Sequence, residues 1–302
     1  MPVKRALVTS CDEERCSICL ETLGGASSTV VLPCGHNFHG QCAVDALWYS
    51  TRCPLCRLEP EWQCDDEEEE EEDQRAFPLD ARGHARIPAG ETVITDRAFA
   101  LCTTLMSISL PDSLTTIGSD AFSGCSSLSL ASLPKGLTAI GSDAFSGCSS
   151  LSLTSLPDSL TSIGDGAFSG CTSLSLTSLP DSLTTVGELA FWRCPSLALT
   201  TLPAGLANIG GHAFHGCESL ALTSLPNSLT SIGEWAFWGC RSLALHSLPP
   251  NLTAIGDHAF QGCSSLGLTS FPVGLRSVGV SAFSDCPQKV RKLVHEKLLR
   301  AS

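Results

Sequence analysis

Apolar and small residues recur with a period of 23 residues from residue 87 to residue 287. Cysteine marks this period most clearly, at Cys102, Cys125, Cys148, Cys171, Cys194, Cys217, Cys240, Cys263 and Cys286. An Ala-Phe pair precedes each cysteine by three or four residues, from Ala98-Phe99 to Ala282-Phe283. A fixed period this short predicts a solenoid of nine units, in which no unit buries its apolar face without its neighbours.

Each unit reads as two extended pieces and a turn. The leucines before the proline, such as Leu176 and Leu179, favour a short strand. Pro-Asp-Ser makes the turn, and Leu160 with Ile163 begins a second extended piece. Gly164 is expected to make a sharp bend with φ > 0. The Ala-Phe pair is expected on a short helical turn with the phenylalanine inward. The regular cysteines are predicted to be buried small apolar thiols, with disulfides or a metal ladder as the alternatives.

The pattern changes to a helical one over residues 288–302. One face of this predicted helix carries four apolar residues, Val290, Leu293, Val294 and Leu298. The opposite face is basic. The segment is therefore predicted to cap the end of the solenoid, and a basic interaction helix is the alternative.

Four consecutive units depart from the small polar residues that otherwise flank the Ala-Phe pair. At the two positions that flank the Ala-Phe pair, the first of these residues is Leu189 and the last is Gln261. The other six flanking residues of the four units are aromatic or imidazole: Trp192, His212, His215, Trp235, Trp238 and His258. Equivalent residues of adjacent units are expected to stack roughly 5 Å apart. The sequence predicts one patch, which is either a binding surface for a partner or lateral packing of the solenoid.

Composition limits the classes of protein to consider. Apolar residues make up 43% of the 302 residues and charged residues only 16%, so a large core can be buried. The net charge is −13, and the single run 65–73 supplies nine acidic residues, which leaves −4 for the rest. This balance makes a general affinity for nucleic acid unexpected. The acidic run is predicted to be a solvated spacer, or else a docking strip for a basic partner.

The cysteine content and the hydropathy of the chain indicate its cellular compartment. No apolar run reaches the roughly 18 residues of a membrane span, so no membrane partner is expected. Residues 1–15 lack the apolar segment of a secretory signal. Seventeen cysteines without such a signal indicate a reducing compartment, which predicts a cytoplasmic or nuclear location.

Eight potential metal ligands lie near the N-terminus with the spacing C-x2-C, then C-x-H-x2-H-x2-C, then C-x2-C. They are Cys16, Cys19, Cys34, His36, His39, Cys42, Cys53 and Cys56. Four thiolate or imidazole ligands close one tetrahedral zinc site, so eight make two structural sites with no position open for a catalytic water. A coincidental cluster and a redox site are the alternatives to a zinc module.

The order of these ligands resembles a RING finger of the two-histidine type, and LIM, PHD or other treble-type fingers are the nearest alternatives. The resemblance implies a cross-brace, with Cys16, Cys19, His39 and Cys42 on one zinc and Cys34, His36, Cys53 and Cys56 on the other. About forty residues cannot bury enough apolar area to fold alone, so the two structural Zn²⁺ ions replace a core.

The same resemblance implies a binding groove beside the zinc sites. In RING ubiquitin ligases the positions that match Ile18, Trp48 and Pro54 contact a ubiquitin-conjugating enzyme. The position of Arg57 matches the arginine that bridges the conjugating enzyme and its ubiquitin in active members. The alternatives are that Trp48 covers the zinc core and that Arg57 is a solvated surface residue.

The repeats resemble the BspA-like leucine-rich repeat, whose units carry an I-G-x-x-A-F-x-x-C signature. The segments from Ile140 to Cys148 and from Ile232 to Cys240 reproduce it. The predicted fold is therefore a small zinc-stabilised RING finger followed by a leucine-rich-repeat solenoid of 23-residue units. The predicted boundaries are a tail (1–15), the finger (16–57), an acidic linker (58–86), the solenoid (87–287) and a capping helix (288–302).

Together the two resemblances imply a RING-type ubiquitin ligase. Its partners would be a ubiquitin-conjugating enzyme, ubiquitin and an unknown protein substrate bound by the solenoid. The ligase would form no covalent intermediate. A non-enzymatic scaffold and a ligand-recognition protein with the finger as a stability element remain the alternatives.

Overall fold

The computed structural model describes residues 29–31, 37–39 and 77–299, and the chain divides into two units, residues 1–72 and 73–302. In the first unit, β1 (Thr29–Val31) and β2 (Asn37–His39) form an antiparallel pair in which Val30 lies opposite Phe38. The side chain of Phe38 is fully buried. The described part of the first unit is thus a hairpin with one buried aromatic residue.

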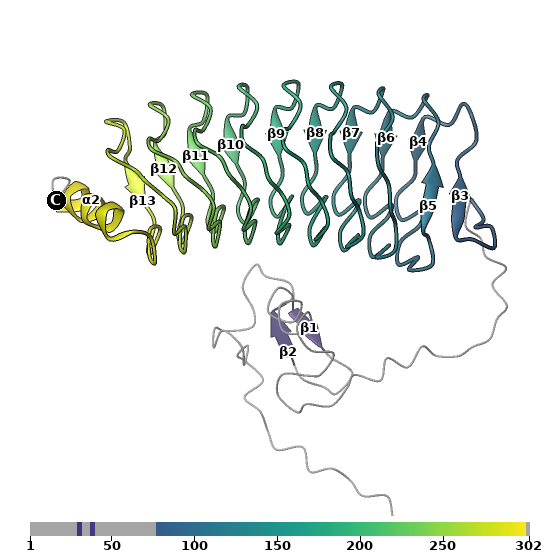
Figure 1. The fold of residues 1–302 in the computed structure, drawn as a ribbon, viewed down its shortest axis with the longest axis horizontal. Coiled ribbons are helices and arrows are strands. Elements are labelled where there is room, and N and C mark those ends of the chain that lie inside the picture. The colour runs from purple at the N-terminus through teal and green to yellow at the C-terminus, as the bar shows by residue number, and fades with distance from the viewer. Residues whose placement is uncertain (1–28, 32–36, 40–76, 300–302) are drawn as a thin grey trace, which may run out of the picture. The chain divides into compact units, whose positions relative to one another are not determined.

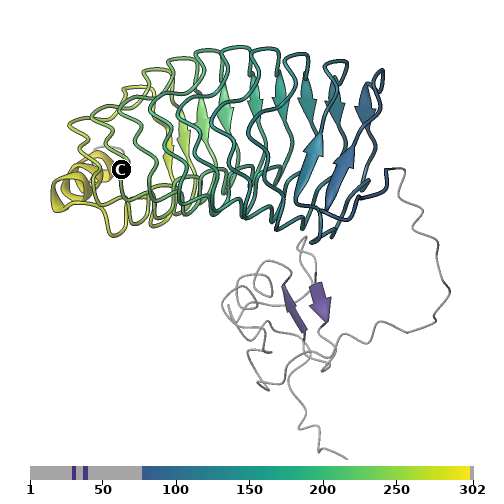
Figure 2. The same cartoon turned by 45° about the vertical axis from the view of Figure 1, so that its right-hand side comes forward.

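The second unit is a solenoid in which each turn adds a two-residue strand (Figure 1). Successive strands pair in parallel, as Ile117 with Ile140, and they align along one side of the coil (Figure 2). One residue of each strand points into the core and the other outward. The strands are β4 (Val93–Ile94), β6 (Thr116–Ile117), β7 (Ala139–Ile140), β8 (Ser162–Ile163), β9 (Thr185–Val186), β10 (Asn208–Ile209), β11 (Ser231–Ile232), β12 (Ala254–Ile255) and β13 (Ser277–Val278).

The ends of the solenoid are closed differently. At the N-terminal end β3 (His84–Arg86) pairs in parallel with β5 (Ser107–Ser109), and Leu79 packs against the core, so the packed region begins before Ile87. At the C-terminal end α2 (Gln288–Leu299) buries Val290 and packs Leu293 and Val294 against the core. Among the described residues, no helix has the length and apolar character needed to cross a membrane.

A column of stacked phenylalanines runs through the core. From Phe99 to Phe283 the ring centroids of neighbours lie 5.1–5.5 Å apart, with interplanar angles of 4–12°. Phe168, near the middle, is fully buried between Phe145 and Phe191. The predicted ladder is therefore present, and it joins every unit to the next through large apolar surfaces.

The repeated cysteines are reduced and buried, as predicted, and they also have a polar role. Each thiol from Cys125 to Cys286 donates to the carbonyl of the phenylalanine 26 residues earlier, at 3.0–3.1 Å. Most of these carbonyls also accept an amide of their own unit, as Phe122 does from Cys125 at 3.0 Å, so the thiol uses the second lone pair. Burial raises the pKa of Cys217 to about 12, which suppresses the reactive thiolate form.

The prediction of a strand at the leucine segment is wrong for most units. Residues 174–179 form no strand, and only β3 and β5, at the N-terminal end, occupy this part of a unit. Successive leucine segments share few backbone bonds, such as the one that the Ala198 amide donates to the Leu176 carbonyl at 3.1 Å. Pro180 also lacks an N–H, so a full ladder cannot form there. The leucines pack as extended chain.

The reason predicted for Gly164 is also wrong, because its φ is not positive. A Cβ at Gly164 would lie 2.6 Å from the Ser142 amide nitrogen and 2.7 Å from the Gly141 carbonyl carbon. Glycine is needed because adjacent turns of backbone approach too closely for a side chain. The left-handed conformation occurs elsewhere in the unit, for example at Asp143 (φ 51°) and Gly170 (φ 70°).

The helical turn expected at the Ala-Phe pair is instead a series of tight turns. The Ser123 amide donates to the Asp120 carbonyl, and the Cys125 amide to the Phe122 carbonyl, both at 3.0 Å. The left-handed residue just before the pair, such as Asp120 (φ 54°), interrupts any helix. The phenylalanine still points inward, as predicted.

The strand face of the solenoid is interrupted between β9 and β10. The strands fall into a five-stranded and a four-stranded sheet that meet there. In most units a threonine hydroxyl donates to the carbonyl of the preceding unit, as Thr161 does to Thr138 at 3.1 Å. Ala207 occupies this position after β9 and has no hydroxyl. Gly205 likewise occupies the position that is Ser182 in the preceding unit. The Ser182 hydroxyl lies 2.7 Å from each of two backbone carbonyl oxygens, those of Asp158 and Leu160.

We expect Gly205→Ser to stabilise the solenoid. A Cβ at Gly205 meets nothing within 4 Å, and the residue's φ is not in the left-handed region. The change should add about 1–2 kcal/mol to the free energy of unfolding, from reduced chain entropy and new hydrogen bonds. Urea denaturation provides the measurement. Gly205→Ala is the control, and equal stability of the two variants would contradict a hydrogen-bond contribution.

Candidate functional site

The hairpin is the part of the predicted zinc module that the structure describes. His39 is the last residue of β2, and residues 32–36, which contain the predicted ligands Cys34 and His36, connect the two strands. Cys34 and His36 lie outside the described residues. So do the remaining residues predicted to act in the finger, which are Cys16, Cys19, Cys42, Cys53, Cys56, Ile18, Trp48, Pro54 and Arg57.

The six aromatic and imidazole side chains predicted to gather on the solenoid do lie together. Trp192 is buried, with 3% of the residue exposed, and the other five are partly exposed. We call this set the aromatic surface: Trp192, His212, His215, Trp235, Trp238 and His258. Its rings form two columns that run along the solenoid, one before and one after the Ala-Phe pair.

The rings of the aromatic surface contact one another within and between the columns. In the first column the Trp235 ring stacks on His258 at 4.1 Å and on His212 at 6.0 Å between centroids. In the second column the His215 ring stacks on Trp238 at 4.5 Å and lies tilted 6.1 Å from Trp192. His212 and His215 connect the columns at 5.5 Å. The rings therefore form one continuous and mutually supported cluster.

The backbone under the first column is strained. His212, Trp235 and His258 have φ values of 54–55°, in the left-handed region. Such a conformation costs a non-glycine residue roughly 1–2 kcal/mol, and Gly166 occupies the same position in another unit. Asp120, Asp143, Leu189 and Ser281 occupy this position in other units with φ values of 51–57°, so the left-handed turn is a general feature of the solenoid rather than one specific to the rings.

Polar groups border the aromatic surface at both ends, and the sequence analysis identified Gln261 among them but neither Arg193 nor Asp285. The guanidinium carbon of Arg193 lies 4.4 Å from the centroid of the Trp192 ring, at a position where most other units have glycine. At the other end Gln261 links His258 to Asp285, with the His258 Nδ1 to Gln261 Oε1 distance 2.7 Å. The replacement of a regular glycine by arginine was the available signal for Arg193.

His215 is a partly buried titratable group of this surface. Its Nδ1 atom is buried and has no hydrogen-bond partner among the described residues. Burial, followed by the nearby His212 and Arg193, lowers the pKa of His215 to about 3. The ring is therefore neutral at neutral pH, and adding a proton would place a charge inside the aromatic stack.

We expect the stability of the solenoid to fall on acidification partly because of His215. The unfolded chain binds this proton near pH 6.5, whereas the folded chain binds it only near pH 3. As pH falls through this range, the free energy of unfolding should decrease by about 1.4 kcal/mol per pH unit from this group alone. Urea denaturation of wild type and His215→Phe from pH 7 to pH 4 isolates the contribution of His215 to the pH dependence of stability, since phenylalanine keeps a ring but cannot titrate.

His246→Phe, which removes an exposed histidine, is the control for that series. As pH falls, the free energy of unfolding of wild type should decrease steadily relative to that of His215→Phe. A difference that is constant across the pH range would show that His215 titrates alike in the folded and unfolded chain.

Two family models match the chain. A model described as BspA type Leucine rich repeat region matches residues 76–198 and 190–299 in six copies, and the Ring finger domain model matches residues 14–57. The chain therefore belongs to the BspA-type leucine-rich repeat family and carries a RING finger ahead of its repeats. RING fingers are generally zinc-binding domains.

Individual relatives match either the finger or the repeats. The chain is 41% identical over 44 residues to E3 ubiquitin-protein ligase SIRP1 of Oryza sativa subsp. japonica, covering 15% of this chain and 14% of that protein. It is 39% identical over 56 residues to E3 ubiquitin-protein ligase ATL23 of Arabidopsis thaliana, covering 18% and 34%. The chain thus spans about a third or less of these relatives' length.

The solenoid resembles a solved structure. A leucine rich cell surface protein from Faecalibacterium prausnitzii A2-165 aligns with a TM-score of 0.53 and 28% sequence identity, over 70% of this chain and 72% of that one. The predicted fold class, a RING finger followed by a leucine-rich-repeat solenoid, is confirmed.

Proposed function

We propose that this protein is a RING-type ubiquitin ligase. The finger binds a ubiquitin-charged conjugating enzyme, and the solenoid binds a protein substrate. The observation that carries the proposal is the Ring finger domain match over residues 14–57, which includes all eight predicted ligands in the expected order. Short matches of the chain to two named E3 ubiquitin-protein ligases support it.

The donor set of the finger fits two structural zinc ions. Six cysteines and two histidines are the soft ligands that Zn²⁺ prefers, and eight of them fill two tetrahedral sites. Cys16, Cys19, His39 and Cys42 would hold one ion, and Cys34, His36, Cys53 and Cys56 the other. The bound ions would supply rigidity rather than a reactive water, because no ligand position stays open.

The proposed reaction is catalysed by positioning. Ile18, Trp48 and Pro54 would contact the conjugating enzyme, and Arg57 would bridge that enzyme and its ubiquitin through its planar donors. A substrate lysine amine attacks the thioester carbonyl, a C–N bond forms as the C–S bond breaks, and the thiol returns to the conjugating enzyme. The ligase holds these groups in a near-attack geometry and forms no covalent intermediate itself.

Discharge of ubiquitin from a panel of charged conjugating enzymes to free lysine tests the proposal. Wild type should accelerate discharge with at least one enzyme, and Ile18→Ala, Trp48→Ala and Arg57→Ala should lose most of that acceleration while zinc content stays at the wild-type level. Leu20→Ala, one residue beyond the first cysteine pair, is the control. If the zinc-loaded protein accelerated discharge from none of the conjugating enzymes, ligase activity would be refuted.

We further propose that the aromatic surface is where the solenoid binds its substrate. Rigid stacked rings with an arginine at one end have the composition of a binding hot spot. Ubiquitin-remnant profiling in cells with and without the protein would nominate a substrate for purified assays. Trp238→Ala should then reduce modification of that substrate and leave discharge to free lysine unchanged. Equal loss in both assays would refute a substrate-specific role.

A further inference from the structure

Lysine is distributed very unevenly in this chain. Of five lysines, Lys289, Lys292 and Lys297 lie within nine residues, and Lys4 and Lys135 are isolated. Residues 77–287 contain one lysine and six arginines, so the solenoid obtains its positive charge almost entirely from arginine. A guanidinium cannot accept ubiquitin, whereas an exposed primary amine can. The surface proposed to bind substrate is therefore nearly free of acceptor groups.

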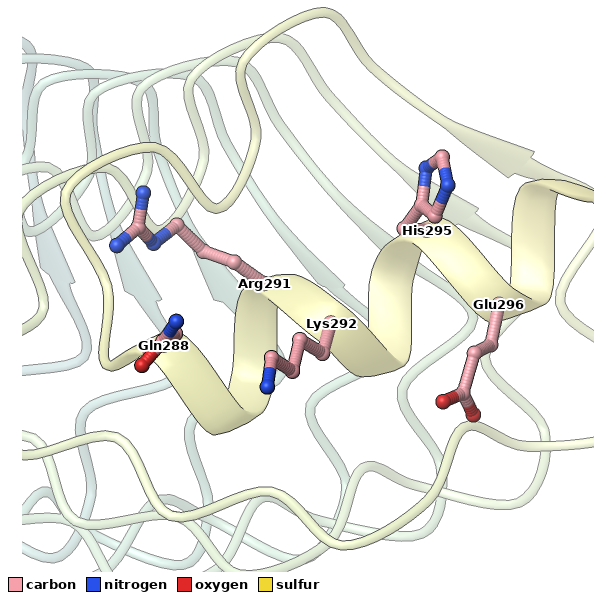
Figure 3. A pocket seen from close by; sticks show the side chains of 5 residues that line it. All are labelled: Gln288, Arg291, Lys292, His295 and Glu296. Atoms are coloured by element: carbon pink, nitrogen blue, oxygen red, sulfur yellow. The ribbon is translucent and has the colours of Figure 1, made fainter.

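The lysine cluster lies on α2, at the C-terminal end of the solenoid. Lys289 and Lys292 are exposed, while Val290 on the opposite side of the helix is buried in the core. Figure 3 shows the Lys292 side chain extending from the helix on the same side as Glu296, whereas Arg291 and His295 extend on the other side. These four residues border a shallow hollow of about 350 Å³, which leaves space beside the Lys292 amine. Lys297 lies further along the same helix.

We infer that α2 is the acceptor site for self-ubiquitination of this protein, and this inference rests on the proposed ligase function. The Nζ amine of an α2 lysine attacks the thioester carbonyl of charged ubiquitin. An isopeptide C–N bond forms, the C–S bond breaks, and the proton that the amine loses ends on the sulfur, so that the conjugating enzyme regains its thiol. Self-modification is thereby directed away from the substrate surface and onto the capping helix.

The test uses the full-length protein with ubiquitin, activating enzyme and a conjugating enzyme that supports discharge. The variant Lys289→Arg/Lys292→Arg/Lys297→Arg keeps the charge and the helix propensity of α2, since arginine and lysine have similar propensities. Lys135→Arg, at an exposed turn of the solenoid, is the matched control. Ubiquitin ladders are compared on gels, ubiquitin remnants are mapped by mass spectrometry, and discharge to free lysine is measured in parallel.

The triple variant should lose most of the self-ubiquitination ladder and discharge ubiquitin to free lysine at the wild-type rate. Lys135→Arg should retain the ladder, and remnants on wild type should map mainly to α2. A triple variant with an undiminished ladder and remnants at Lys4, Lys135 or the N-terminal amine would overturn the acceptor site while leaving ligase activity intact. Absence of discharge by wild type would overturn the ligase function and this inference together.

Discussion

Replacing Phe168 by alanine is expected to lower the free energy of unfolding by about 3–5 kcal/mol. The ring is fully buried and stacks on Phe145 and Phe191 at 5.5 Å on either side. Its removal leaves a cavity in the middle of the column, and the neighbouring units are held apart by their own backbone bonds, so they cannot close the gap. Because each unit contacts only its neighbours, the loss also weakens coupling between the two halves of the solenoid.

Urea denaturation followed by circular dichroism measures this effect. Phe271→Ala is the matched control, since Phe271 is only partly buried and makes an edge contact with the terminal Phe283. The control should cost clearly less than Phe168→Ala. A broadened or two-step transition in Phe168→Ala would show that the halves unfold separately, whereas equal costs at both sites would contradict the importance of the central column.

Removal of zinc is expected to abolish ubiquitin transfer and leave the solenoid folded. Structural zinc contributes roughly 10–16 kcal/mol to small finger peptides, far more than a domain of this size can replace by burial. In the part of the chain that the structure describes, no group of three or more metal-ligating side chains occurs. The described part of the solenoid therefore offers chelation no comparable target, and we expect it to keep its fold.

Three measurements check this expectation: zinc content, discharge to free lysine, and limited proteolysis. After chelation, cleavage should appear within residues 1–72 while a fragment beginning near residue 77 persists. Cys53→Ser should reproduce the loss of zinc and of discharge, and Cys11→Ser, which removes a thiol outside the predicted ligand set, should retain both. Full discharge by metal-free protein would contradict a zinc-dependent fold of the finger.

The repeat was readable from the sequence because one short pattern occurs nine times. A fixed period places equivalent side chains above one another, so the phenylalanine ladder, the buried thiols and the gathering of Trp235 with its neighbours follow from register alone. The same logic predicted the cap, where the apolar face of α2 covers the last unit. The order of the eight ligands likewise indicated a RING finger, through its resemblance to that family.

Other features depend on how neighbouring turns of backbone meet. Gly164 is required by an approach of 2.6 Å from the adjacent turn, a contact with Ser142, 22 residues earlier, that no local pattern encodes. The left-handed residues before the Ala-Phe pair are set by closure of the turn, since Trp235 would not adopt φ 55° by local preference. The thiol-to-carbonyl bonds and the interruption after β9 arise from the same stacking.

The sequence by itself determined the two-part organisation, the period, the core residues and the chemistry of the predicted zinc ligands. These follow from residue type and spacing, which act locally or repeat regularly. Only the tertiary structure decided the environment of individual side chains: the buried Nδ1 of His215, the position of Arg193 over Trp192 and the exposure of Lys289 and Lys292 on α2. Burial and electrostatic environment depend on atoms from several turns at once, so they become defined only when the chain has coiled.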